Sequence, residues 1–203
     1  MNFFGHAAVA SWTSTAPGTI LGAMLPDFQT MSGVRVARTA DADVAAGIDF
    51  HHATDAKFHR LPVVTGLMRE LDAILERLGC ARGPRRAVAH IGVELLLDGV
   101  LVAEPAYREA YLAGLAHEAV IEWRDPGDDE RFAQLISRLR AYGVPDDLKR
   151  PTAIVQRLAR ALGHRPLLAP SASDLRAIET ALVDYQSRVA VASETVMRAM
   201  RNA

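Results

Sequence analysis

Two stretches of the chain place histidines beside carboxylates at a helical spacing. The first contains His51, Asp55 and His59, and the second contains His90, Glu94 and Asp98. Because residues four apart lie one turn apart on the same face of a helix, each stretch predicts a column of imidazoles and carboxylates. Buried charges are costly unless they are paired or bound to a metal. We therefore predict that both columns provide metal ligands.

A looser pair, His6 and Asp27, adds two candidate ligands near the start of the chain. His52 also stands at helical spacing from Asp55, so the sequence leaves open whether His51 or His52 faces inward. Imidazole nitrogens and carboxylate oxygens suit zinc, manganese and iron. A divalent ion of one of these metals is the predicted cofactor.

Each column also has an interpretation that needs no metal. The 51–59 stretch could be an exposed polar helix face with Asp–His pairs. The 90–98 helix is otherwise apolar, and its carboxylates, Glu94 and Asp98, could form structural ion pairs with Arg85 or Arg86. The residues alone do not choose between these interpretations and a metal site.

The elements that must position these side chains are predicted to be helices. Ala, Leu, Arg and Glu dominate, and there is almost no period-two alternation of the kind that marks a strand. We expect an all-α protein with one domain over 1–203, built from seven to eight helices. Predicted boundaries are a first helix over 3–12, helix ends near Pro26, Arg60, Gly79 and Trp123, and a cap for the last helix at Ser173 or Asp174.

Composition excludes several classes of function. The net charge is -1 and the sequence pI is about 6.7, so bulk charge predicts no binding to nucleic acid or to an anionic membrane. No apolar run reaches the roughly 18 residues of a transmembrane helix. The single cysteine, Cys80, cannot form an internal disulfide. We expect a soluble, cytoplasmic protein, and its oligomeric state is not readable from the sequence.

Several segments occur in an order that is typical of one enzyme family. They are MNFFGH at 1–6, GAMLPDF at 22–28, GIDFHHATD at 47–55, RRAVAHIGVELLLD at 85–98, and a tail from LRAYGVPDDL through VQRLARAL to the last helix. In this order the chain resembles the acyl carrier protein phosphodiesterases over nearly its whole length. Each motif is moderately specific, and their order and spacing carry the resemblance.

The resemblance implies a helical fold like that of the HD-domain metal phosphohydrolases. It also implies a metal-dependent phosphodiesterase, which removes 4′-phosphopantetheine from holo acyl carrier protein, often with manganese. The residues that match the polar positions of the family are His6, Asp27, His51, Asp55, Glu94 and Asp98. Among these, the carboxylates of Asp27, Asp55 and Glu94 are the expected catalytic groups, since such a group positions or deprotonates the attacking water.

The chain departs from the family pattern at several of these positions. His52 stands where the family has Arg, His59 where it has Asp, His90 where it has Gly, and Glu94 where it has Asp, while Gly99 replaces a His. Nitrogen ligands in place of oxygen favour zinc or iron. The resemblance, with these departures, implies that the substrate is either holo acyl carrier protein or a related phosphoester.

Two further functions fit the same residues. The spacings His51–Asp55 and His90–Glu94 resemble the H-x-x-x-D and H-x-x-x-E pairs of zinc-dependent phospholipase C and P1-type nucleases. A non-catalytic helical module that binds a ligand or partner is the other alternative. If the acidic carrier protein is the partner, the Arg-rich segments at 137–142, 147–151 and 156–165 could supply a basic docking patch.

Overall fold

The computed structural model describes residues 1–201, and over these residues the chain is mostly helical. Nine α-helices, one short 3-10 helix and two short strands account for the regular structure of the described part. The predicted all-α fold class is confirmed, with one or two more helices than the sequence indicates. Within the described residues, no helix is long and apolar enough to cross a membrane.

The described chain forms two compact units. One comprises 1–56 and 101–145, and the other comprises 57–100 and the chain from 146 onward. The boundaries fall inside helix α3 (Ala42–Phe58), inside helix α5 (Arg82–Leu101) and just before the 3-10 helix η1 (Asp146–Lys149). The single domain over 1–203 stays a prediction, and each unit is described by itself below.

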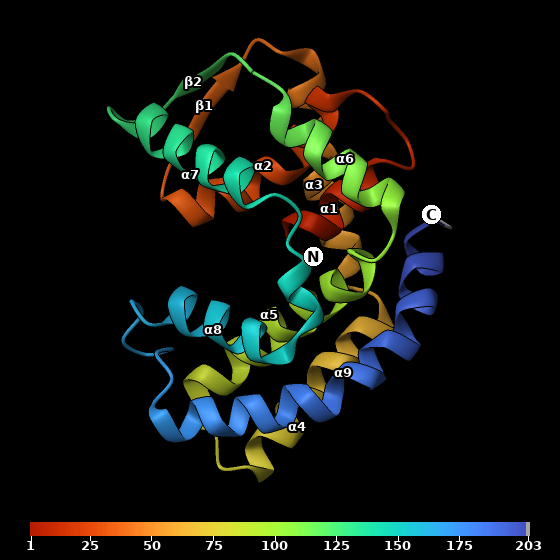
Figure 1. Ribbon diagram of the computed structural model, residues 1–203, viewed down its shortest axis with the longest axis vertical. Helices are drawn as coiled ribbons and strands as arrows, with labels where there is room; N and C mark the ends of the chain where they lie inside the picture. Colours follow the sequence, from red (N-terminus) through yellow and green to blue (C-terminus); the bar gives the residue numbers. More distant parts are fainter. Residues whose placement is uncertain (202–203) are drawn as a thin grey trace. The chain divides into compact units, whose positions relative to one another are not determined.

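In the first unit, three helices pack around an aromatic core (Figure 1). The elements of this unit besides α3 are α1 (Phe3–Ala10), α2 (Pro17–Ser32), β1 (Val36–Thr39), α6 (Pro105–Ala116), β2 (Ile121–Trp123) and α7 (Asp128–Tyr142). Helices α1, α2 and α6 contact one another in pairs. The ring of Phe3 lies 5.7 Å from that of Phe28 and 6.0 Å from that of Tyr111, and all three side chains are buried. This packing holds the start of the chain against α2.

In the second unit, the long helix α9 (Ala172–Arg201) packs against α4 (Pro62–Arg77) and α8 (Pro151–Leu162) (Figure 1). Every third or fourth residue of α9 is buried, as an amphipathic helix requires. Its buried Tyr185 donates a hydrogen bond of 2.9 Å to the carbonyl oxygen of Leu67. The polar tip of the ring is thereby satisfied inside the unit.

Helices α2 and α3 approach each other through two glycines. A Cβ placed on Gly22 would lie 2.2 Å from the carbonyl oxygen of Val44, and one on Gly47 would lie 2.2 Å from the carbonyl oxygen of Thr19. No side chain fits at either position, because backbone atoms occupy the space. The two glycines therefore let the backbones of α2 and α3 come into direct contact.

Helix α2 does not end near Pro26, so that prediction is wrong. The helix continues through Pro26 to Ser32, and Gly33 follows it with a left-handed φ of 68°. A proline inside a helix removes one backbone hydrogen bond. Here the next turn carries Phe28, which is fully buried against Phe3, and this burial offsets the lost hydrogen bond.

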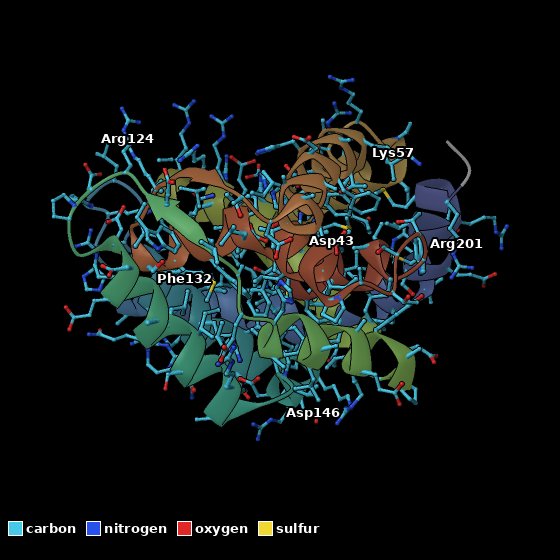
Figure 2. The ribbon with its side chains drawn as sticks, turned by 90° about the horizontal axis from the view of Figure 1, so that it is seen from above. Asp43, Lys57, Arg124, Phe132, Asp146 and Arg201 are labelled. Carbon is cyan, nitrogen blue, oxygen red and sulfur yellow. The ribbon has the colours of Figure 1, made fainter. Side chains whose placement is uncertain are left out.

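The helix that begins at Pro105 ends at Ala116 and not near Trp123. The residues Ile121–Trp123 form strand β2, which pairs antiparallel with β1, with Thr39 opposite Ile121 and Val36 opposite Trp123. Trp123 packs on Phe132 of α7, with ring centroids 4.7 Å apart. Figure 2 shows Phe132 beside this strand, while Arg124 extends outward from its end. The short sheet is a local departure from the predicted all-helical chain.

The last helix is capped at Ser171, two residues before Ser173 and three before Asp174, the two caps that the sequence indicates. Ser171 is the capping residue, since its hydroxyl accepts a hydrogen bond of 3.2 Å from the backbone N–H of Asp174. Asp174 reaches back and accepts bonds from the backbone N–H groups of Ser171 and Ala81, at 2.8 and 2.7 Å. This reciprocal arrangement is a capping box that also ties the start of α9 to the residue before α5.

Replacing Asp174 with alanine is expected to lower the free energy of unfolding by about 1–2 kcal/mol, because two backbone donors lose their acceptor. Burial raises the pKa of Asp174, but hydrogen bonds from Ser171 and Ala81 outweigh this effect and lower the pKa below its usual value. A carboxyl with a lowered pKa stabilises the folded protein above roughly pH 4, and this contribution is lost as the pH falls further.

Urea denaturation at several pH values measures this effect. The difference between wild type and Asp174→Ala should be constant near neutral pH and should shrink below about pH 4. Ser173→Ala is the matched control, because Ser173 is exposed and its hydroxyl forms a hydrogen bond with that of Ser171 rather than with the carboxylate of Asp174. A loss of stability in Ser173→Ala equal to that in Asp174→Ala would contradict the capping box.

Candidate metal sites

In the first unit, three helices bring two histidines and a carboxylate together. His6 of α1, Asp27 of α2 and His51 of α3 each offer one ligand atom, and these atoms all lie within 4.8 Å of one another. His6 and His51 are buried, and Asp27 is partly exposed. We call His6, Asp27 and His51 the first ligand group.

A backbone carbonyl orients the imidazole of His51. Nδ1 of His51 lies 2.8 Å from the carbonyl oxygen of Ala23. Since a carbonyl can only accept, Nδ1 carries the proton and Nε2 keeps its lone pair. Metal-binding histidines are commonly fixed by such a bond from the second nitrogen. The close approach of α2 and α3 at their glycines makes this contact possible.

His51 is neutral near physiological pH. Burial and, after it, the imidazole of His6 lower the pKa of His51 to about 4, against the opposing effect of the bond to Ala23. The two rings are stacked, with centroids 3.8 Å apart and an interplanar angle of 28°. Two protonated imidazoles would repel each other at this distance. A neutral imidazole is the form that binds a metal.

Asp55 lies beside the first ligand group. Its Oδ1 is 3.5 Å from Nε2 of His6 and 2.9 Å from the amino group of Met1. Helix α3 positions it one turn after His51, as the helical spacing predicts. Asp55 therefore contacts one member of the group and can orient its ring.

In the second unit, His59, His90 and Glu94 form the second ligand group, with ligand atoms again within 4.8 Å of one another. His59 directly follows the end of α3, whereas His90 and Glu94 lie one turn apart on α5. Oε1 of Glu94 is 3.1 Å from Nε2 of His90 and 3.4 Å from Nε2 of His59. One carboxylate oxygen thus lies between two imidazole nitrogens.

Glu94 is held as a carboxylate. Burial by itself raises the pKa of Glu94, but the hydrogen bond with His90 and the neighbouring imidazoles lower it overall. The side chain is nearly buried, while His90 is half-exposed and His59 is partly exposed. The group therefore has a buried, charged end and a more open, imidazole end.

His52 and Asp98 are predicted ligands that lie in neither group. His52 is exposed on α3, with its ring edge-on to that of His51 at 5.5 Å, so His51 is the histidine that faces inward. Asp98 is fully buried on α5, one turn after Glu94. At the next residue, Gly99, a Cβ would lie 2.2 Å from the carbonyl oxygen of Leu148, so α5 packs tightly here.

Both groups offer two imidazole nitrogens and one carboxylate oxygen. This donor set suits zinc, and with open positions it also suits iron. Three protein ligands leave room for water or a substrate, as catalytic metal sites require. The fixed Nδ1–H of His51 and the charged state of Glu94 show that these residues fit a divalent metal.

One pair of polar residues was not predicted from the sequence. Nε2 of His117, just after α6, lies 2.8 Å from Oδ2 of Asp41, and both side chains are partly buried. Asp41 also caps α3 by accepting hydrogen bonds from the N–H groups of Asp43 and Val44, and its own pKa is lowered chiefly by His117. The two partners are far apart in the sequence, so no spacing pattern indicates the contact.

No protein-family model, no curated protein and no solved structure matches this chain. The resemblance to the acyl carrier protein phosphodiesterases therefore stays a prediction. The two ligand groups are the features of the molecule that point to a function.

Proposed function

We propose that this protein is a metal-dependent hydrolase of phosphoesters, with the second ligand group as its reactive centre. The observation that supports this most is the position of His90. It belongs to the second ligand group and also lines a pocket of about 750 Å³ in the same unit. A substrate in this pocket would therefore meet a ligand of the metal.

The residues of the second ligand group have separate roles in this proposal. A divalent ion bound there would polarise a phosphoryl oxygen and lower the pKa of a bound water. Glu94 supplies the negative charge that balances the ion, and its burial keeps bulk water away from that side. His90, which is about half-exposed, is the member nearest to solvent and is placed to orient the ester at the mouth of the site.

A phosphoester is the proposed substrate for two reasons. The pocket is also lined by Arg82 and Arg86, and guanidinium groups match the geometry of phosphate oxygens. The ordered motifs of the chain resemble those of a phosphodiesterase family. The first ligand group is proposed to hold a second ion, with zinc or iron favoured at both groups by their nitrogen ligands. Holo acyl carrier protein is a candidate substrate within this class.

The test combines elemental analysis with a phosphoester assay. The protein is purified without a metal-binding tag, and its content of manganese, iron and zinc is measured. Hydrolysis of bis(4-nitrophenyl) phosphate and 4-nitrophenyl phosphate is then followed with each metal and after treatment with a chelator. We expect bound metal and hydrolysis that the chelator abolishes.

Two outcomes would overturn the proposal. If no divalent metal binds even in excess, the ligand groups are structural and the protein is a non-catalytic binding module. If metal binds but neither a phosphomonoester nor a phosphodiester is hydrolysed, the hydrolase proposal is wrong. Hydrolysis that is retained by a variant lacking both Glu94 and His51 would point to a contaminating enzyme.

A further inference from the structure

The pocket beside His90 has a charged side and an apolar side. Arg82, Arg86 and His90 line it from one face of α5, since they are spaced four residues apart. Ile91 of α5 and the loop residues Leu167 and Leu168 provide the apolar lining. All of these residues belong to the second unit.

The two pocket arginines differ from the arginine between them. Arg85 forms ion pairs with Asp72 and Glu76, so its charge is compensated within the protein. Among the described residues, neither Arg82 nor Arg86 forms an ion pair or a hydrogen bond through its side chain, and both are exposed. Two cationic groups are therefore available to a ligand in the pocket.

The position of Arg82 in the helix does not by itself favour folding. Arg82 is the first residue of α5, and the first turn of this helix contains no acidic residue. The N-terminus of a helix carries a partial positive charge, so cations there are disfavoured while anions are stabilised. The carboxylate of Asp174 already accepts a hydrogen bond from Ala81 just before this helix. The two guanidinium groups are therefore what favours an anion at this side of the pocket.

The apolar side of the pocket is held firmly in place. A Cβ on Gly83 would lie 1.9 Å from the carbonyl oxygen of Leu167, so the loop backbone lies directly on α5. The side chain of Leu167 is 87 % exposed, although it is a large apolar residue. A leucine whose backbone is held in this way at the edge of a pocket offers the contact area of its exposed side chain to an apolar ligand group.

We propose that this pocket binds a phosphate ester that carries an apolar group. Arg82 and Arg86 bind the phosphate, and the leucines of the loop contact the hydrocarbon part. This inference rests on the proposed function and names its substrate class, since His90 would bring the ester to the second ligand group. If this is correct, the pocket binds a phosphate ester with a long hydrocarbon group more tightly than one with a short hydrocarbon group.

Binding of non-hydrolysable phosphonates tests the inference without any catalytic step. Affinities of hexylphosphonate and methylphosphonate for the full chain are measured by calorimetry, with and without manganese. We expect hexylphosphonate to bind at least about tenfold more tightly, because its additional methylene groups contact the apolar side. Equal affinities would overturn the inference.

Variants separate the two sides of the pocket. Arg82→Ala/Arg86→Ala should weaken both ligands by about tenfold or more. Leu167→Ser/Leu168→Ser should remove the preference for the hexyl chain and leave methylphosphonate binding unchanged. Arg160→Ala, an exposed arginine of α8 outside the pocket, is the matched control and should behave as wild type. Circular dichroism confirms that each variant is folded.

Failure of this inference can be told apart from failure of the proposed function. If phosphonate binding depends on Arg82 and Arg86 but no metal-dependent hydrolysis is found, the proposed ligand pocket is supported and the proposed hydrolase activity is rejected. Metal-dependent hydrolysis that is unchanged in the arginine and leucine variants would support the hydrolase and reject the pocket. Binding of a soluble phosphonate is also compared with binding of vesicles that contain phosphatidic acid. Tighter binding of the soluble phosphonate indicates that the natural ligand is a small ester, and tighter binding of the vesicles indicates a lipid headgroup.

Discussion

Replacing Glu94 with glutamine is expected to lower the affinity of the second ligand group for a divalent metal by about 100-fold or more. Oε1 of Glu94 lies between the ring nitrogens of His59 and His90, and the lowered pKa keeps this group charged. Glutamine has the same shape but no negative charge to balance a cation. Phosphoester hydrolysis should fall with metal binding, by about 10³-fold.

Elemental analysis and calorimetry measure the first effect, and the phosphoester assay measures the second. Glu179→Gln is the matched control, because Glu179 is exposed on α9 and belongs to neither ligand group. His51→Ala disrupts the first ligand group in the other unit. Each variant is therefore expected to lose one metal equivalent, and a Glu94→Gln protein with full metal content would contradict the assignment.

Replacing Gly47 with alanine is expected to lower the free energy of unfolding by about 3 kcal/mol. The new Cβ would lie 2.2 Å from the carbonyl oxygen of Thr19 and 2.8 Å from the backbone nitrogen of Ala23. Backbone atoms of a packed helix cannot move aside as a flexible side chain can, so α2 and α3 must separate. The bond between Ala23 and His51 would then lengthen, and the first ligand group would bind its metal more weakly.

Thermal and urea denaturation measure the change in stability, and elemental analysis measures the metal. Gly66→Ala is the matched control. Gly66 is exposed inside α4, and a Cβ there would meet nothing within 4 Å. Alanine is favoured over glycine in a helix interior, so this variant should be more stable by about 0.5–1 kcal/mol. If Gly47→Ala stabilises the protein as much as Gly66→Ala does, the backbones of α2 and α3 do not approach each other as closely as described.

The local spacing of residues allowed much of the helical structure and most of the candidate ligands to be predicted. Helices begin at Pro62 and Pro105, since proline is tolerated in the first turn of a helix, and Gly79 follows α4 with a left-handed φ of 78°. These signals act within one or two turns, so they can be read from the sequence. The same is true of the pair His90 and Glu94, which one helix turn brings together.

Other features depended on contacts between distant segments. The continuation of α2 past Pro26 follows from the burial of Phe28, and β2 forms because β1 provides the pairing partner. The sequence does not show which distant segment packs against Phe28 or pairs with β2. In both places tertiary packing outweighed the intrinsic secondary-structure preference of the residues, because packing supplies most of the stability of a short element.

The arrangement of the ligands shows most clearly which features depend on local spacing and which depend on tertiary contacts. The sequence indicates two columns, each on its own helix, and the residue types that suit a divalent metal. In the structure, the column at 51–59 is shared between two groups, since His51 joins His6 and Asp27 while His59 joins His90 and Glu94. The reason is physical: helical periodicity sets which side chains share a face, but helix packing selects which faces meet.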